Sequence, residues 1–240
     1  MAKIDLLSLS WRRRKSTKPS NGEAIPLSFY EMWDRVSQFA AEIRGSPFMS
    51  EMMERRAKFG KGGTMAALDC ATLYALTRFQ RPTIVIETGG FIGFSAAFIL
   101  KALADEKLTT ARLYSIEADE HCEHWALVPD DLRSQLVPLR SKVEELVRGD
   151  QLPAKIDMFF HDSSHRYRHM QWEFREFWRR LGDRGLLASH DVNMTGAFAE
   201  FVADTYAHDK RTELLDYDRT RHHEWGRWGY IGFMIKKAAA

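Results

Sequence analysis

Short apolar runs alternate along the chain with longer segments whose apolar residues recur at helical spacing. The run at 83–86 is predicted as a buried strand, and the segment 94–103 that follows it as a helix. The same alternation continues toward the C-terminus. Strands or extended segments are expected at 83–86, 111–116, 135–139, 156–160, 185–189, 213–216 and 230–235, and helices at 28–44, 65–79, 94–103, 121–127, 142–147, 167–181 and 197–207.

This alternation predicts an α/β protein with a doubly wound, mostly parallel sheet that helices cover on both faces. Ligands bind such sheets at the carboxyl ends of the strands, where the strand order reverses. Polar groups follow four of the predicted strands at these ends: Glu87 with Gly89, Glu117, Asp162 with His165, and His190 with Asp191. Polar groups at the carboxyl ends of four strands favour an active site over a purely structural role for these residues.

The N-terminal part lacks this alternation. Residues 1–26 are irregular, and their basic cluster 12–15 is interpreted as a solvated tail. The helix expected at 28–44 either packs on the core or lids a pocket. The glycine-rich stretch 58–64 lacks the spacing of a phosphate loop, so it predicts a flexible connector. We therefore expect a tail and helical cap over 1–64 and the main domain over 65–240.

Composition narrows the functional classes without selecting one. The 240 residues are 45% hydrophobic and 28% charged, as in soluble globular proteins with a substantial core. A formal net charge of +2 lacks the basic excess of a nucleic-acid binder. Two cysteines are too few for a disulfide framework, and no apolar run approaches the ~18 residues that cross a bilayer. Without a leader pattern at the start, these features predict a cytoplasmic protein.

The turn after the first strand is the strongest single candidate for a ligand site. Gly89, Gly90 and Gly93 let the backbone approach a ligand closely and direct a helix N-terminus at it. The spacing is E-x-G-x-x-x-G-x-S, which differs from the dinucleotide pattern G-x-G-x-x-G. Glu117 ends the next strand, where a carboxylate can accept hydrogen bonds from both ribose hydroxyls. A nucleoside cofactor is therefore expected here.

Taken in order, these motifs resemble the class I S-adenosylmethionine-dependent methyltransferases, especially the group that O-methylates small molecules or sugars. The matching residues are Glu87, Gly89, Gly93, Ser95, Glu117, Asp162, His165, His190 and Asp191. One position departs, because Arg184 stands where that group has the first of two glycines. The resemblance implies a seven-stranded Rossmann-like sheet with an N-terminal helical extension, and S-adenosyl-L-methionine as the cofactor.

The resemblance also implies roles for the residues of the cofactor site. The glycine turn would hold the methionine part, with Glu87 either at its amino group or supporting the turn. Glu117 would hold the ribose, Ser141 and Lys142 would border the adenine, and Asp162 would lie near the methyl-transfer centre. The implied cofactor-binding set is Glu87, Gly89, Gly90, Gly93, Ser95, Glu117, Ser141, Lys142 and Asp162.

Methyl transfer to a hydroxyl requires proximity of the reacting atoms and a base for the hydroxyl proton. His165 is the candidate base, because histidine titrates near neutrality and similar enzymes place a catalytic histidine three residues after this aspartate. Asp162 is the second candidate catalytic residue. The alternative for His165 is a cap of the following helix. His161 precedes Asp162 on the strand and so points to the opposite face, which indicates a structural role.

Some members of the resembled family bind a divalent cation through three acids at the ends of the fourth and fifth strands. Asp162 and Asp191 match two of these positions, and His190 takes the third. Neighbouring strands lie about 4.8 Å apart, so both carboxylates could reach one ion. Two carboxylates and an imidazole suit Mn, Fe or Zn better than Mg. Without a metal, His190 and Asp191 would position the substrate or share the role of the base.

Aromatic and histidine residues gather near the C-terminus. They either stack on an acceptor ring or pack a hydrophobic edge or dimer interface, so a homo-oligomer is one expectation. The cluster consists of His222, His223, Trp225, Trp228 and Tyr230. The expected function is O-methylation of a small-molecule or glycosyl hydroxyl. The alternative is a non-catalytic nucleoside-binding protein on the same fold. The glycine spacing disfavours a nicotinamide-dependent oxidoreductase.

Overall fold

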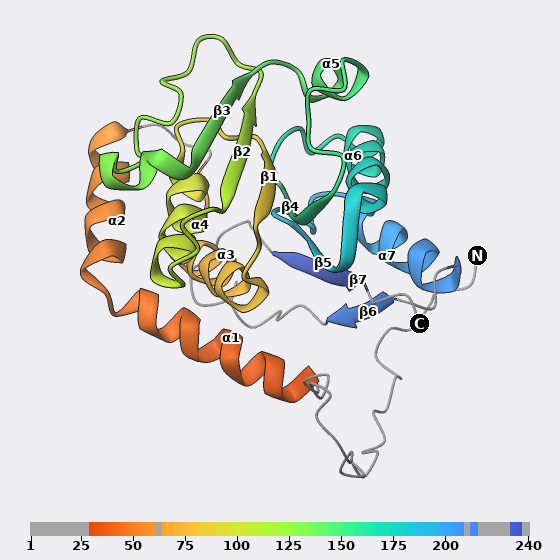
Figure 1. Cartoon of the computed structure of the whole chain (residues 1–240), viewed down its shortest axis with the longest axis horizontal. Helices are drawn as coiled ribbons and strands as arrows, with labels where there is room; N and C mark the ends of the chain where they lie inside the picture. The colour runs from red at the N-terminus through yellow and green to blue at the C-terminus, as the bar shows by residue number, and fades with distance from the viewer. Residues whose placement is uncertain (1–28, 61–63, 209–211, 216–230, 237–240) are drawn as a thin grey trace.

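A seven-stranded sheet forms the centre of the computed structural model, which describes residues 29–60, 64–208, 212–215 and 231–236 (Figure 1). The strand order is β3-β2-β1-β4-β5-β7-β6. The strands are β1 (Ile84–Thr88), β2 (Arg112–Glu117), β3 (Leu136–Arg140), β4 (Ile156–His161), β5 (Leu181–Ser189), β6 (Thr212–Leu215) and β7 (Gly232–Lys236). Pairing is parallel from β3 to β5, whereas β7 is antiparallel to both of its neighbours. The predicted α/β class with a mostly parallel sheet is confirmed.

Helices cover both faces of this sheet (Figure 1). They are α1 (Phe29–Arg44), α2 (Pro47–Phe59), α3 (Ala67–Gln80), α4 (Phe94–Asp105), α5 (Val143–Arg148), α6 (Tyr167–Arg180) and α7 (Ala197–His208), with a 3₁₀ turn at Asp130–Gln135. One hydrophobic cluster joins the sheet to α1–α4 and a second joins it to α5–α7. Successive strand residues alternate between them, since Met158 and Phe160 belong to the first cluster and Phe159 to the second. The doubly wound arrangement follows from this alternation.

The strand order reverses between β1 and β4, which lie side by side. From β1 the chain winds outward through β2 to β3, and it then returns to continue through β4 and β5 on the other side. The carboxyl ends of β1 and β4 therefore flank the position at which sheets of this class bind their ligands. Thr88 pairs with His161 there, and the amide of Asp162 donates to the carbonyl of Thr88 at 2.9 Å.

The N-terminal helices pack on the same core as the helices of the main domain. Val36 and Ile43 of α1 are buried in the cluster that also contains α3 and α4. Arg78 of α3 pairs with Glu42 and lies 4.0 Å from the centre of the Phe39 ring. Of the two interpretations of the first helix, the structure supports core packing.

One helix was not predicted and one predicted helix is wrong. Helix α2 lies before the connector expected at 58–64 and overlaps only its first two residues; Ser46 caps the amide of Met49, Pro47 occupies the first turn and Met52 is buried. Residues 121–127 form turns instead of a helix. The amide of Trp125 donates to the carbonyl of Phe91 in the glycine turn. It therefore cannot donate to the carbonyl four residues earlier, as it would in a helix.

The chain also passes directly from α6 into β5. The helix ends at Arg180 and the strand begins at Leu181, so Gly182 and Gly185 both lie inside the strand. Arg184 has a φ of 62°, and the register with β4 shifts in this stretch, as in a bulge. The predicted strand 185–189 is thus only the regular half of β5.

Some predicted features lie outside the described residues, namely the basic cluster 12–15, residues 61–63 of the glycine-rich loop, and the C-terminal aromatic cluster 222–230. Within the described ranges, the longest apolar helices fall short of the length and hydropathy that a membrane span requires.

Candidate active site

The glycine turn joins β1 to α4 and leaves no room for side chains. Gly89 and Gly93 have φ angles of 85° and 82°, which favour glycine. A Cβ atom at Gly89 would lie 2.1 Å from the carbonyl oxygen of Asp162, and one at Gly90 would lie 2.3 Å from the hydroxyl of Ser115. The turn is therefore held directly against the ends of β4 and β2.

Glu87 lies beneath this turn and is fully buried. Its two carboxylate oxygens accept hydrogen bonds from the hydroxyls of Ser95 and Ser115, each at 2.5 Å. The indole N–H of Trp125 donates in turn to Ser115 at 2.7 Å. Burial raises the pKa of Glu87 to about 7, against the effect of these hydrogen bonds. Of the two roles expected for Glu87, this geometry supports the one in which it holds the turn, and Ser95 shares that role.

Glu117 connects the turn to the end of β2. One of its carboxylate oxygens accepts from the amide of Phe91 at 2.7 Å, and the other accepts from the amide of Asp119 at 2.7 Å. The backbone carbonyl of Glu117 accepts from the amide of Ser141 at 3.0 Å, and Lys142 follows immediately at the start of α5. The structure thus brings the predicted ribose and adenine residues together along the ends of β1, β2 and β3.

Four polar side chains from the ends of β4 and β5 form a group that we call the open cluster: Asp162, His165, His190 and Asp191. Nδ1 of His190 lies 2.9 Å from Asp162 Oδ1 and 3.5 Å from Asp191 Oδ2. Nε2 of His165 lies 3.6 Å from each of the same two oxygens. One potential ligand atom from each residue falls within 4.8 Å of all the others. The sequence predicted three of these residues as a metal site, and the structure adds His165 to them.

The open cluster adjoins the glycine turn. Asp162 continues β4 and touches the turn through its own backbone, as the close approach to Gly89 shows. The amide of His190 donates to the carbonyl of His161 at 2.9 Å, which extends the pairing of β4 and β5 to the cluster. Asp191 has a φ of 53°, an unusual value for this residue type outside turns. The backbone at the strand ends therefore fixes the cluster next to the predicted cofactor site.

Opposite charges within the open cluster shift its pKa values. Burial acts to raise the pKa of Asp162, but the charge of His190 and the nearby imidazoles hold it below its usual range. Burial acts to lower the pKa of His190, and Asp162 nevertheless raises it well above its usual value. Within the part of the chain that the structure describes, three buried atoms of the cluster have no hydrogen-bond partner: His165 Nε2, His190 Nε2 and Asp191 Oδ1.

Sequence reasoning missed Asp69. This residue lies in the first turn of α3, is 3% exposed, and has its Oδ2 atom 3.5 Å from Nε2 of His190. The available signal was an acid between apolar residues at the start of a predicted helix, a position that usually faces solvent. Only the fold brings that acid to the end of β5.

A second group, which we call the closed cluster, lies on the other face of β4 and is centred on Glu173 of α6. This buried carboxylate accepts from the hydroxyls of Thr88 at 2.7 Å and Ser163 at 2.9 Å. It also hydrogen-bonds His161 Nδ1 at 2.6 Å and His169 Nε2 at 2.8 Å. Burial acts to raise the pKa of Glu173, but the two imidazoles lower it to about 2. The structural role predicted for His161 agrees with this arrangement.

Comparisons with known proteins agree with the fold and with the motifs. Residues 86–192 match a protein family described as a methyltransferase domain. No curated protein sequence matches the chain.

Several solved structures share the fold. An O-methyltransferase from Bacillus cereus in complex with SAH has a TM-score of 0.60 at 14% identity, over 85% of this chain and 100% of that one. The SAH-bound methyltransferase PaMTH1 of Podospora anserina has a TM-score of 0.59 at 16% identity, over 90% and 100% of the two chains. The O-methyltransferase TomG of Streptomyces achromogenes in complex with SAM has a TM-score of 0.58 at 14% identity, over 80% and 91%. The family match over residues 86–192 and the shared fold agree with the resemblance inferred from the motifs.

Proposed function

We propose that this chain, which carries a methyltransferase domain at residues 86–192, transfers the methyl group of S-adenosylmethionine (SAM) to a hydroxyl oxygen of a small-molecule or glycosyl acceptor. One observation carries the proposal. The glycine turn, Glu117 and the open cluster adjoin one another along a single edge of the sheet, so a donor site lies directly beside acid–base groups.

The cofactor site fits a nucleoside with an amino-acid tail. The backbone of Gly89, Gly90 and Gly93 would face the methionine part. A Cβ atom at each of these positions would clash with protein atoms, so the turn can pack this closely only with glycine. Glu117 would accept hydrogen bonds from the ribose hydroxyls, and Ser141 with Lys142 would border the adenine. Bound SAM supplies an electrophilic methyl group on a sulfonium. The protein's part is to align an acceptor oxygen with it.

We assign His165 as the general base. Its Nε2 atom has no hydrogen-bond partner within the described residues, so it is free to accept a proton, and its side chain is 24% exposed as a whole. Nε2 would take the hydroxyl proton of the acceptor, whose oxygen would receive the methyl group that bound SAM supplies, with SAH as the leaving group. Asp162 and Asp191 each lie 3.6 Å from Nε2 and stabilise the resulting imidazolium.

The open cluster also fits a divalent cation. Atoms that bind one ion at about 2.1 Å lie roughly 3 to 3.5 Å apart. The atoms of Asp162, His190 and Asp191 are separated by 2.9 and 3.5 Å, and Asp191 Oδ1 is unpartnered within the described residues. Two carboxylates and an imidazole favour Mn, Fe or Zn. A bound ion would lower the pKa of an acceptor hydroxyl.

His165 could serve this cation site as a fourth ligand instead of acting as the base. The two roles predict different results for His165→Ala. If His165 is the base, His165→Ala keeps its affinity for Mn²⁺ in calorimetry. If His165 is a metal ligand, His165→Ala loses most of that affinity. We favour the base, because His165 is the most exposed imidazole of the cluster and lies on the loop beyond the strand.

A non-catalytic nucleoside-binding protein is the competing function, since a fold alone does not establish catalysis. Such a protein would need the glycine turn and Glu117, but not the open cluster. The test is incubation with methyl-labelled SAM, Mn²⁺ and a panel of phenols and sugars. We expect label on an acceptor oxygen and release of S-adenosylhomocysteine (SAH), both reduced in His165→Ala. Tight SAM binding with no transfer to any acceptor class would favour the binding protein.

A further inference from the structure

We infer that Asp69 is a positioning residue for the open cluster: its carboxylate holds the Nε2–H group of His190, so that Nδ1 of the same ring faces the metal site. The inference rests on the cation site proposed above. It concerns a helix residue that lies outside the segment matched to the methyltransferase family, residues 86–192.

The burial of Asp69 is the first argument. A carboxylate that is 3% exposed loses most of its hydration, and this loss is costly unless a positive or donor group compensates it. The structure places a basic group, His190, against Asp69, with Oδ2 and Nε2 separated by 3.5 Å. Both side chains are shielded from water, since His190 is itself 7% exposed. The contact therefore has a larger energetic effect than a surface ion pair would have.

The orientation of the His190 ring is the second argument. Nδ1 points into the open cluster, toward Asp162 at 2.9 Å and Asp191 at 3.5 Å, whereas Nε2 has Asp69 at its side. A neutral imidazole carries one proton and binds a metal through the other nitrogen. Ligation through Nδ1 therefore requires the proton to stay on Nε2. Asp69 is the carboxylate beside Nε2, at an ion-pair distance of 3.5 Å without a hydrogen bond in this structure, and in the metal-bound protein it would accept that proton's hydrogen bond, as carboxylates beside metal-binding histidines commonly do.

This arrangement also gives α3 a direct connection to the site. Asp69 sits in the first turn of that helix, and the buried residues that follow it anchor the helix in the core shared with α1 and α4. The segment matched to the family contains the ligand atoms, whereas the group that orients His190 comes from the preceding helix.

The test is a calorimetric titration of the full chain with Mn²⁺, comparing wild type with Asp69→Asn. Asparagine keeps the size of the side chain but lacks the charge. We expect Mn²⁺ affinity to fall about 10- to 100-fold, the usual effect of removing such a partner. The affinity for SAH should stay at its wild-type value. Glu176→Gln is the matched control: it neutralises another poorly exposed acid, which pairs with Arg179 and Arg180 on α6, and should leave Mn²⁺ affinity unchanged.

The outcomes separate this inference from the proposed function. Unchanged Mn²⁺ affinity in Asp69→Asn would overturn the role of Asp69 and leave the cation site intact. Failure of the wild type to bind Mn²⁺ would overturn both. A joint loss of SAH and Mn²⁺ binding would mean that Asp69 supports the fold in general, which also contradicts the inference.

A measurement on the wild type avoids any folding defect in the variant. Nitrogen-15 spectra of histidine-labelled protein with Zn²⁺ should show His190 protonated at Nε2 and bound to the metal through Nδ1. The reverse assignment, with the metal at Nε2, would overturn the inference.

Discussion

The two acid–histidine clusters lie on opposite faces of the end of β4, and they differ in how completely the protein satisfies them. In the closed cluster Glu173 hydrogen-bonds four side chains at 2.6 to 2.9 Å. In the open cluster His165 Nε2 and Asp191 Oδ1 have no hydrogen-bond partner among the described residues, and His190 Nε2 has only its 3.5 Å contact with Asp69. In the closed cluster one buried atom, His161 Nε2, lacks a partner among the described residues. Buried polar groups are normally paired. The closed cluster therefore stabilises the fold, whereas the open cluster keeps groups available to a ligand.

The comparison predicts that substitutions in the open cluster reduce turnover, whereas substitutions in the closed cluster reduce stability. The largest expected effect is on turnover. His165→Ala in the open cluster should lower turnover about 10²- to 10⁴-fold, because it removes the general base. SAH affinity should be kept, and the free energy of unfolding should change by less than about 1 kcal/mol. Released SAH measures the first quantity and urea unfolding the last. Wild-type turnover in this variant would end the assignment of the base.

Glu173→Gln in the closed cluster should instead act on stability. The substitution removes the charge that His161 and His169 share, and breaking a buried ion pair costs about 3 to 5 kcal/mol. Urea unfolding at neutral pH measures this loss. If His165→Ala and Glu173→Gln destabilise the protein equally, the distinction between the two clusters is wrong.

Glu87 sharpens the comparison, because its partners are neutral hydroxyls and its pKa is raised to about 7. Below the ordinary carboxyl pKa, Glu87 is protonated in both states. As the pH rises toward 7 the unfolded chain releases this proton first, so stability falls as the pH increases through this window. The expected loss is on the order of 2 to 3 kcal/mol between about pH 5 and pH 8.

In Glu87→Gln this part of the pH dependence should disappear, as urea unfolding at several pH values would show. The same slope in wild type and variant would mean that Glu87 is ionised in the folded protein. The substitution Glu176→Gln, which alters an acid paired with arginines, should keep the wild-type slope.

Local patterns were sufficient to predict the central sheet and most of the open cluster. Asp162, His190 and Asp191 directly follow predicted strands, and parallel strands bring their carboxyl ends to one edge. The glycine turn was predictable for the same reason, since its spacing marks a strand that passes into a helix.

Features that depend on distant contacts were not predictable. Asp69 looks like an ordinary helix acid until α3 packs beside β5. Residues 121–127 form turns instead of the predicted helix, because the amide of Trp125 donates to the carbonyl of Phe91, a residue of the glycine turn. Helix α2 had a usable signal in Ser46 and Pro47, but the nearby glycines suggested a connector.

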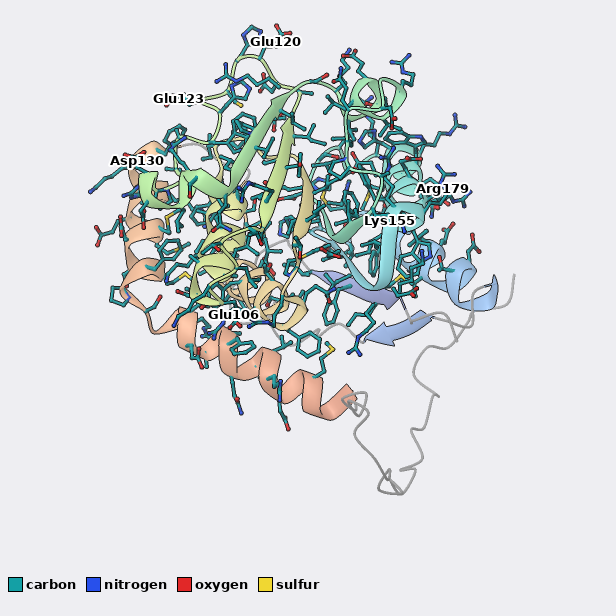
Figure 2. The ribbon with its side chains drawn as sticks, viewed as in Figure 1. Glu106, Glu120, Glu123, Asp130, Lys155 and Arg179 are labelled. Carbon is teal, nitrogen blue, oxygen red and sulfur yellow. The ribbon has the colours of Figure 1, made fainter. Side chains whose placement is uncertain are left out.

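The most direct test of the account is a calorimetric titration with SAH, comparing wild type, Glu117→Ala and Glu120→Ala. Glu120 is an exposed acid at the tip of the loop that follows β2 and points away from the sheet, so it is a matched control (Figure 2). We predict saturable one-to-one binding to wild type and to Glu120→Ala. Glu117→Ala should bind about 10- to 100-fold more weakly, because a charged acceptor of the ribose hydroxyls is lost. No binding by the wild type, or equal affinity in all three proteins, would contradict the proposed cofactor site.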